Sequence, residues 1–311
     1  MTTRDESLAV AEGVDLGPGP VALAVDVGGT GLKAGLIDSS GRITDARTAP
    51  TPACAGTDGA EVIDAVARLR DAFAHTAVTS AAVVVPGIVD VATGSGIHSA
   101  NLGWQDAPLR ALLTERLSIG VTVGHDVRSA GRAEFDLAEA MPPDAVMLTL
   151  GTGIAAAVRI DGRIVSAGGY AGEVGFTEVA VETADGLFRG PAEHIASAAA
   201  ISRRYAERSG RDVTGSLAVL EAAQAGDPVA QEVLAEAVEA LGAMCAQMVA
   251  VIAPQTIVFG GGLSGAAGLL GGVETAMRSR LGFHRVPSIR RARLGSSAGL
   301  IGAGLLTRDA L

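Results

Sequence analysis

Two glycine-rich turns, each set between two apolar segments, constrain the fold of this chain more than any other feature. Residues 26–43 read DVGGTGLKAGLIDSSGRI, and residues 149–164 read TLGTGIAAAVRIDGRI. Both segments contain an apolar run of strand length, a Gly-Thr-Gly turn, a second apolar run, another turn and Gly-Arg-Ile. A repeat at a separation of about 120 residues predicts two related domains, because solenoid repeats recur at about 20–50 residues.

Chance is the alternative explanation of this repeat, since the chain has 42 glycines among 311 residues. The turns and the flanking strand-like runs recur together, which argues against chance. A length of 311 residues also fits two domains, at about 100–200 residues per domain.

The charge and the apolar pattern exclude several classes of protein. The net charge is −10, from 24 basic and 34 acidic residues, and nucleic-acid binders normally carry a basic surface. The mean hydropathy is +0.37, yet no uninterrupted apolar run reaches the roughly 18–20 residues of a membrane span. We therefore expect neither a nucleic acid nor a membrane as a partner.

The N-terminal segment and the number of cysteines indicate the cellular compartment. Residues 1–19 carry acidic residues where a secretory signal has a basic region and an apolar run. We expect them to form a flexible N-terminal tail. Two cysteines, Cys54 and Cys245, provide no disulfide framework and fit a reducing environment. These signals predict a cytoplasmic protein.

Apolar runs and helical periodicity alternate along the chain. The patterns predict strands over residues 21–27, 32–38, 81–85, 119–123, 145–150, 154–160, 163–165 and 256–259. They predict helices over residues 61–75, 127–140, 191–208, 228–252, 268–280 and 297–306. Mixed elements with short links are typical of the α/β class.

The glycine turns are candidates for binding phosphate. A turn without Cβ atoms lets backbone N–H groups approach an anion closely. The residues concerned are Gly28, Gly29, Thr30, Gly31, Gly151, Thr152, Gly153, Gly260, Gly261 and Gly262. The first two turns also match the loose dinucleotide pattern G-x-G-x-x-A, but that pattern requires a helix next, and here a strand is expected. The chain has no G-x-x-x-x-G-K-[ST] segment.

Two aspartates are placed where they can serve a phosphoryl transfer. Asp126 follows an expected strand and precedes an expected helix, a position that projects into the ligand crevice of an α/β domain. Its carboxylate can accept the proton of a hydroxyl that attacks phosphorus. A helix N-cap is the alternative role. Asp26 lies beside the first glycine turn and suits Mg²⁺ through water, or it accepts a hydrogen bond within the turn.

These segments, taken in order, resemble the ROK family of sugar kinases. The resemblance rests on DVGGTGLKAGLID, PGIVD, NLGW, HD with a following Glu, LGTGIAAAVRIDGRI, AGEVGF and VFGGGLS. It covers about residues 21–306 and implies an actin-like, hexokinase-type ATPase fold. That fold has two α/β domains, with ATP and sugar in the cleft between them. We expect the domains to span 20–125 plus about 296–311, and 126–295.

By this resemblance, Asp126 matches the catalytic base of the family. Gly87, Asn101 and Glu173 match contacts to sugar hydroxyls, and Glu193 resembles another sugar-binding acid. Each has a structural alternative: Asn101 as a turn residue, Glu173 as the partner of an arginine, and Glu193 as a first-turn acid favoured by the helix dipole.

The chain departs from the family pattern at three places. Phe176 replaces a histidine that touches sugar and commonly ligates zinc, and residues 177–192 contain no Cys or His in place of a zinc cluster. Structural zinc needs four N or S ligands, so we expect no zinc, with this loop held by its own packing or shortened. His125 stands in place of an asparagine. It is either a sugar contact or spectator, or a group that alters the protonation of Asp126.

The expected function is phosphorylation of a hexose or hexose derivative at a primary hydroxyl, with ATP and Mg²⁺. Loss of the polar partner at Phe176 predicts that this chain recognises the C1/C2 end of the sugar differently from an ordinary glucokinase. A catalytically degenerate sugar-binding regulator and a polyphosphate-using kinase are the alternatives. The resemblance also implies a homodimer or homotetramer.

Overall fold

The computed structural model describes residues 3–4, 11, 13–54 and 56–309, which divide into two compact units. Unit 1 comprises Met1–Glu139, Ile164–Ala171 and Leu294–Leu311, and unit 2 comprises Ala140–Arg163 and Gly172–Arg293. Each unit has a mixed sheet with helices, as the α/β prediction required. The division falls after Glu139 and not after residue 125, because helix α4 (Asp126–Asp136) packs on the C-terminal helix of unit 1.

Unit 1 is built on a six-stranded sheet with the order β1-β4-β3-β2-β5-β9. Its members are β1 (Thr3–Arg4), β2 (Ala22–Val27), β3 (Gly31–Ile37), β4 (Ile43–Pro50), β5 (Ser80–Val85) and β9 (Gly120–His125). Strands β4, β3 and β2 are antiparallel neighbours, whereas β2, β5 and β9 run parallel. The carboxyl ends of these three parallel strands therefore lie at one edge of the sheet.

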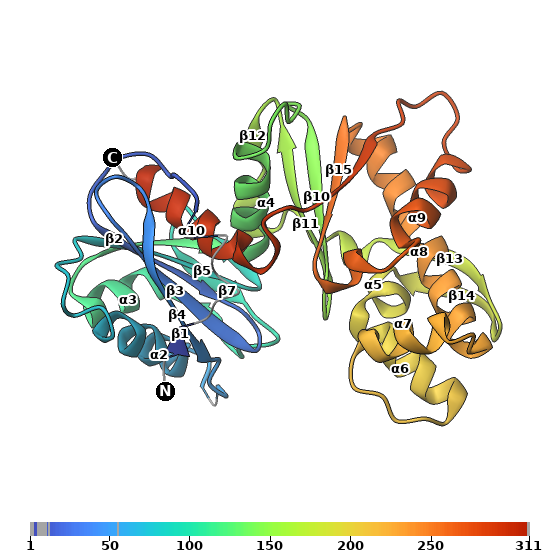
Figure 1. Cartoon of the computed structure of the whole chain (residues 1–311), viewed down its shortest axis with the longest axis horizontal. Coiled ribbons are helices and arrows are strands. Elements are labelled where there is room, and N and C mark those ends of the chain that lie inside the picture. The colour runs from blue at the N-terminus through green and yellow to red at the C-terminus, as the bar shows by residue number, and fades with distance from the viewer. Residues whose placement is uncertain (1–2, 5–10, 12, 55, 310–311) are drawn as a thin grey trace. The chain divides into compact units, whose positions relative to one another are not determined.

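Helices cover both faces of this sheet. Leu23 and Val25 of β2 join the core cluster that includes α2 (Ala60–Asp71) and α3 (Leu109–Leu117). Ala24, which points to the other face, joins the cluster beneath α4 and α10 (Ala298–Asp309). Figure 1 shows α10, in red, lying along the strands of unit 1. Strands covered on both faces are continuously apolar, which explains the runs in the sequence.

A small three-stranded sheet, which sequence patterns missed, extends unit 1. It contains β6 (Ile88–Asp90), β7 (Ser95–His98) and β8 (Gln105–Ala107), in that order. The short 3₁₀ segment η2 (Ala167–Gly169) also belongs to unit 1 and packs near β6.

Part of the predicted N-terminal tail is packed against unit 1. Residues 1–2, 5–10 and 12 lie outside the described residues, but Thr3–Arg4 pair with β4 and Leu16 is buried. The Arg308 guanidinium of α10 donates hydrogen bonds to the carbonyl oxygens of Gly17 (3.1 Å), Pro20 (2.7 Å) and Asp38 (3.0 Å). The expectation of a flexible tail is therefore wrong for residues 13–19, because α10 holds them.

Unit 2 repeats the strand plan of unit 1. Its sheet has the order β12-β11-β10-β15-β16, made of β10 (Ala145–Leu150), β11 (Ile154–Ile160), β12 (Arg163–Ile164), β15 (Thr256–Gly260) and β16 (Ser288–Arg291). Strands β11 and β10 pair antiparallel, as β3 and β2 do in unit 1. Strands β10, β15 and β16 run parallel, as β2, β5 and β9 do. The duplicated turn segments thus begin two sheets of the same topology.

The remaining elements of unit 2 surround a long helix. They are η3 (Val174–Phe176), β13 (Glu178–Thr183), β14 (Gly186–Pro191), α5 (Glu193–Ala196), α6 (Ala198–Ser209), α7 (Ser216–Gln224), α8 (Pro228–Ile252), η4 (Gly262–Gly265) and α9 (Leu269–Arg278). Helix α8 begins as predicted, because the Asp227 side chain accepts a hydrogen bond from the Ala230 N–H at 3.1 Å.

The helix predicted over residues 191–208 is wrong at its start. Pro191 ends β14, where it pairs with Glu178. Two helices follow and are separated at Ser197, whose hydroxyl accepts a hydrogen bond from the Ala200 N–H and caps α6. The segment 177–192 folds as the hairpin β13–β14.

By length and composition alone, helix α8 could cross a membrane. However, 56% of its most apolar 18-residue stretch is buried inside unit 2. It packs against β13, α5, α6 and α9. Core helices of globular domains have the same composition, so this helix is weak evidence for a membrane span.

Candidate active site

The carboxyl edge of the unit 1 sheet collects the candidate residues of that unit. The turn at 28–31 follows β2, Gly87 follows β5 by two residues, and Asp126 follows β9 directly. Val85 pairs with His125 across β5 and β9. Because these three strands are parallel neighbours, their following residues converge at one edge, the place where α/β sheets bind ligands.

The first glycine turn presents an open backbone. Gly29 and Thr30 are exposed, and the Gly28 N–H donates to the Gly31 carbonyl at 2.9 Å. Thr51 fixes the turn from behind, because its hydroxyl donates to the Gly28 carbonyl at 2.6 Å and its N–H donates to the Thr30 carbonyl at 3.2 Å. The fixed turn therefore exposes backbone for an anion to approach, with no Cβ at Gly29 and a hydroxyl at Thr30.

Asp26 lies just before this turn with its side chain in the buried layer beneath α10. Its carboxylate lies 3.5 Å from the Lys33 Nζ, which also donates to the Ser296 carbonyl at 2.5 Å. A Cβ on Gly299 would come within 2.5 Å of the Asp26 Oδ2, so the first turn of α10 closes against this carboxylate. Burial raises the pKa of the Asp26 carboxyl, and Lys33 opposes that rise. A nearby cation is therefore favourable here.

Asp126 is the first residue of α4, and the cap of that helix is its neighbour. The His125 Nδ1 accepts a hydrogen bond from the Arg128 N–H at 3.2 Å, whereas the Asp126 Oδ1 accepts from the Val127 N–H at 2.6 Å. The alternative role of Asp126 as N-cap thus belongs to His125. The Asp126 side chain is 25% exposed, which leaves it accessible to a substrate hydroxyl.

His125 is a neutral imidazole in this environment. Burial, with a smaller contribution from the positive charge of Arg128, lowers the pKa of His125 to about 3. Its Nδ1 lies 3.4 Å from the Asp126 Oδ1. Since Nδ1 accepts the Arg128 N–H, it carries no proton, and this contact is not an ion pair.

Gly87 directly precedes β6 and Asn101 follows β7, two paired strands of the small sheet of unit 1. Gly87 has φ +99°, and a Cβ there would lie 2.2 Å from the carbonyl oxygen of His98, so only glycine fits this close approach. The exposed Asn101 follows β7, and its Nδ2 lies 4.0 Å from the position of a Cβ on Gly29. The structure thus places Asn101 beside the first glycine turn.

Arg128 is a buried residue that sequence reasoning missed. Its guanidinium donates to the carbonyls of Val89 (2.9 Å), Gly169 (3.0 Å) and Ala171 (3.4 Å). It therefore holds η2 and β6 against the beginning of α4, two residues from Asp126. An arginine in the first turns of a predicted helix gives no sequence signal for this role, because its acceptors are backbone carbonyls distant in the chain.

In unit 2 the other two glycine turns lie side by side. The turn at 151–153 follows β10 and that at 260–262 follows β15, and these parallel strands pair Thr149 with Gly260. Gly261 has φ +81°, and a Cβ there would lie 2.3 Å from the Leu150 carbonyl oxygen. The two turns therefore pack backbone to backbone, and Thr152 is exposed on one of them.

Glu193 connects one of these turns to the loop of Glu173 and Phe176. Its Oε2 accepts a hydrogen bond from the Ile154 N–H at 2.7 Å. A Cβ on Gly153 would lie 2.5 Å from this oxygen, and one on Gly175 would lie 3.1 Å from it. Glu173 is partly exposed at the start of η3, and Phe176 is 61% exposed.

Among the described residues, the candidates form no metal cluster and line no part of a cavity found in unit 2. Within the described part of the chain, no group of three or more His, Cys, Asp or Glu side chains is arranged to hold a metal ion. A cavity of about 660 Å³ lies in unit 2 between α8 and α9, and none of the candidate residues lines it.

Comparisons with known proteins identify relatives of this chain. The model of the ROK family matches residues 22–310. A protein of Brucella melitensis named bifunctional enzyme NanE/NanK is 33% identical over 287 residues, which are 92% of this chain and 53% of that protein. The chain thus spans about half the length of this relative.

Two further similarities cover nearly whole proteins. A protein of Halalkalibacterium halodurans named glucokinase is 29% identical over 321 residues, covering 92% of this chain and 94% of that protein. The crystal structure of a ROK family glucokinase from Streptomyces griseus, in complex with glucose and AMPPNP, aligns with a TM-score of 0.77 at 26% identity. That alignment covers 93% of this chain and 99% of the glucokinase.

Proposed function

The chain belongs to the ROK family, and on that premise we propose that it is a kinase that transfers the γ-phosphoryl group of ATP to a primary hydroxyl of a hexose or hexose derivative. The observation that carries the proposal is the carboxyl edge of unit 1. There the exposed glycine turn, Gly87 and Asp126 follow three parallel strands, β2, β5 and β9, and Asn101, which follows β7 of the small sheet, lies beside the turn.

Asp126 is the proposed general base. In a phosphoryl transfer the acceptor hydroxyl loses its proton as its oxygen attacks phosphorus, and a positioned carboxylate receives that proton. Asp126 is partly exposed and stands at the end of a strand, so it can reach such a hydroxyl. The neighbouring His125 is a neutral imidazole and forms no ion pair with this carboxylate.

The three glycine turns are the proposed nucleotide contacts. In these turns Gly29, Thr30, Thr152, Gly261 and Gly262 are exposed, and their backbone is proposed to offer N–H donors to phosphate oxygens, as nests of this kind do in other phosphate sites. Asn101, Glu173 and Glu193 are the proposed partners of the sugar hydroxyls, and Gly87 and His125 complete the proposed sugar-binding set.

Mg²⁺ fits this chain as a companion of ATP, with one carboxylate supplied by the protein. Asp26 is the candidate, since its buried carboxylate beside the first glycine turn gains from a cation bound through water. Mg²⁺ is held in kinases largely by phosphates and water and offsets the phosphate charge.

The experiment is a coupled assay of ATP consumption with a panel of glucose, mannose, fructose and N-acetylhexosamines. Sugar-dependent turnover in the wild type, reduced at least about 10³-fold in Asp126→Asn with unchanged circular dichroism, is the expected result. Turnover without a sugar requirement, or an active Asp126→Asn variant, would contradict it. Replacement of ATP by polyphosphate in the same assay tests the alternative donor, and a wild type inactive with every sugar and donor would favour a sugar-binding regulator.

Phe176 is the proposed determinant of a changed sugar preference. Its ring is 61% exposed and presents apolar surface next to Glu173 in the sequence. A pocket that loses a polar partner discriminates less between hydroxyl arrangements. We expect Phe176→His to shift the ratio of kcat/KM values between glucose and N-acetylhexosamines. An unchanged ratio would exclude Phe176 from this role.

Three further properties complete the proposal. The chain needs no zinc, because the hairpin β13–β14 is held by protein side chains, and prolonged chelation before an assay with added Mg²⁺ should leave activity unchanged. It acts in the cytoplasm and forms a homodimer or homotetramer, a state that light scattering after size-exclusion chromatography measures.

A further inference from the structure

The hairpin β13–β14 in unit 2 stands between two groups of candidate residues. It pairs Glu178 with Pro191 at its base and Thr183 with Gly186 at its tip. Phe176 precedes the base by two residues and Glu193 follows it by two, and the Ala192 N–H donates to the Thr177 carbonyl at 2.9 Å. Any movement of the hairpin is therefore transmitted to both groups.

A two-stranded hairpin is marginal by itself and needs an anchor. Val179 and Val181 are buried, while the residues that alternate with them are exposed, so one face of β13 packs on α8. Polar bonds from α8 fix both ends of the same strand. The Gln247 Nε2 donates to the Glu178 carbonyl at 3.1 Å at the base, and the Glu236 Oε1 accepts from the Ala184 N–H at 2.8 Å at the tip.

The two hydrogen bonds are separated by similar distances along α8 and along β13. Glu236 and Gln247 are eleven residues apart on a helix, about 16 Å at 1.5 Å per residue. Glu178 and Ala184 are six residues apart on a strand, about 20 Å at 3.3 Å per residue. Helix α8 thus runs antiparallel beside β13 and holds it at two points.

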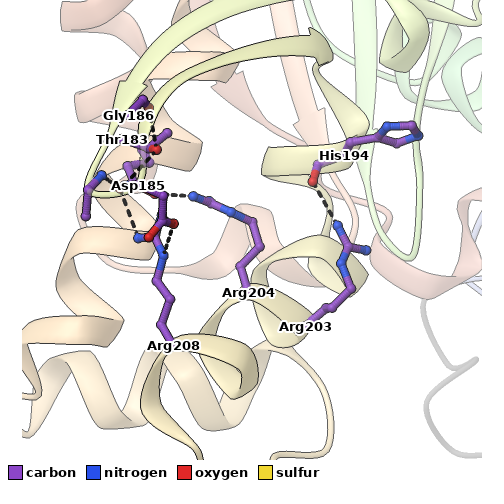
Figure 2. Close-up of polar contacts among 9 residues, drawn as sticks. Thr183, Asp185, Gly186, His194, Arg203, Arg204 and Arg208 are labelled. Carbon is purple, nitrogen blue, oxygen red and sulfur yellow. Dashed lines mark hydrogen bonds and ion pairs between the residues drawn. The ribbon is translucent and has the colours of Figure 1, made fainter.

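The bond at the tip is part of an ionic cluster that links three elements. Arg204 and Arg208 of α6 both bond the Glu236 carboxylate, and the Arg208 Nη1 donates to its Oε1 at 3.0 Å. The Arg208 Nε also donates to the Asp185 carboxylate in the hairpin turn at 2.8 Å. Figure 2 shows Arg204 and Arg208 reaching from α6 toward this turn, while Arg203 extends to the carbonyl of His194.

The cluster depends on the negative charge of Glu236. The Glu236 side chain is 9% exposed, and those of Arg204 and Arg208 are 12% and 13% exposed. Burial would raise the pKa of Glu236, but hydrogen bonds from Arg208, Ala184 and Arg204 outweigh it and lower the pKa. Loss of the charge leaves two largely buried guanidinium groups without their shared carboxylate, an unfavourable state.

We propose that Glu236 is a positioning residue that, through the tip of the hairpin β13–β14, fixes the placement of the sugar-binding residues Glu173 and Glu193. The inference rests on the proposed function for the role of those two residues. Glu236 itself acts through the hairpin and the two arginines.

Glu236→Gln tests this inference, because it removes the charge and keeps an oxygen that can accept the Ala184 N–H. Its matched control is Glu239→Gln, also on α8, where an exposed carboxylate pairs with the Arg280 Nη2 at 2.8 Å. Hydrogen exchange of the full chain, without ligands, measures the hairpin directly. We expect amide exchange over residues 178–191 to accelerate at least about 10-fold in Glu236→Gln, with wild-type rates in Glu239→Gln.

Kinetics then separate a positioning role from a merely structural one. We expect Glu236→Gln to raise the KM for the sugar about 10-fold, with kcat and the KM for ATP changed by less than about 3-fold. If Glu236→Gln does not fold, Asp185→Asn removes the negative charge of the exposed partner of Arg208, and a smaller change in the same direction supports the inference.

The two proposals fail in different ways. The inference alone is overturned if the wild type is active and the soluble charge-removing variant keeps the wild-type sugar KM or the wild-type hairpin exchange. A wild type with no sugar-dependent turnover overturns the proposed function together with the inference.

Discussion

Protonation of His125 should destabilise unit 1, because the fold holds this imidazole neutral. Its side chain is 4% exposed, it caps α4, and its pKa is about 3 in place of the ordinary 6.5. In the unfolded chain the same group binds a proton near pH 6.5. Between about pH 3 and about pH 6.5 the unfolded state therefore binds more protons than the folded state.

The sign and the size of the effect follow from this difference. The contribution of His125 to stability is fully present above about pH 6.5 and is lost as the pH falls toward 3. Each pH unit in this window costs about 1.36 kcal/mol. From pH 7.5 to pH 5.0 the loss is about 2 kcal/mol, since only the interval below pH 6.5 contributes.

The assay is urea denaturation followed by the fluorescence of Trp104. This residue is the only tryptophan of the chain, it is fully buried, and it lies in unit 1, as His125 does. His125→Asn replaces the Nδ1 acceptor of the Arg128 N–H by an amide oxygen, and asparagine is a good N-cap. The free energy lost between pH 7.5 and 5.0 should be about 2 kcal/mol smaller in His125→Asn than in the wild type.

His98→Asn is the matched control, since the His98 side chain is exposed in the same unit. It should retain the pH dependence of the wild type. Equal losses in the wild type and in His125→Asn would refute the depressed pKa and the neutral imidazole with it. The pH profile of kcat/KM should keep its shape in His125→Asn, because a neutral ring adds no charge beside Asp126.

Three other predictions concern packing. In urea denaturation, Gly261→Ala should lower the free energy of unfolding by at least about 2 kcal/mol more than Gly268→Ala does. Both positions have positive φ, but only at Gly261 would the added Cβ lie 2.3 Å from a carbonyl oxygen, that of Leu150. Equal losses in the two variants would contradict this close approach. Arg128→Met should destabilise unit 1 by about 2–4 kcal/mol, since three backbone carbonyls accept its hydrogen bonds, and an unchanged urea midpoint would contradict that role. Trp104 should emit at short wavelength in the native protein and shift only when unit 1 unfolds, whereas an emission typical of exposed indole would contradict its burial.

Periodicity predicted the long elements because burial determines them over many residues. The strands that became β2, β5, β10 and β15 are covered by other elements and therefore carry uninterrupted apolar runs. Helix α8 combined a long apolar pattern with a cap at Asp227 and proline at its first position, so its bounds were predicted within about one residue. The repeat of Gly-Thr-Gly turns predicted two related domains, and the structure has two units whose sheets share one strand plan.

Short elements were missed because three or four residues carry no measurable period. The strands β6, β7 and β8 are of this length and are separated by turns. The hairpin β13–β14 had a usable signal, since EVAVET alternates with its two valines buried. Its turn, Ala184-Asp185, is not among the dipeptides that favour tight hairpins. Pro191, interpreted as a helix start, ends the second strand.

The candidate site was predictable in type and only partly in mechanism. Glycine turns and a strand-end aspartate follow general chemistry, so Asp126 and the turn at 28–31 could be selected from the residues. The roles of Arg128 and Glu236 could not, because a buried charge is recognised by partners that are distant in sequence. The neutrality of His125 likewise depends on burial and on Arg128, which only the fold reveals.

The discontinuity of unit 1 has a consequence for synthesis on the ribosome. Residues 172–293 of unit 2 emerge before α10, whose Leu300 and Ile301 cover the apolar face formed by Ala24, Ile37 and Val84. Unit 2 can therefore complete its core first, although it begins later in the chain. Until α10 is translated, the nascent sheet of unit 1 lacks the cover that this helix gives to one apolar face, and exposed apolar surface makes a folding intermediate prone to aggregation.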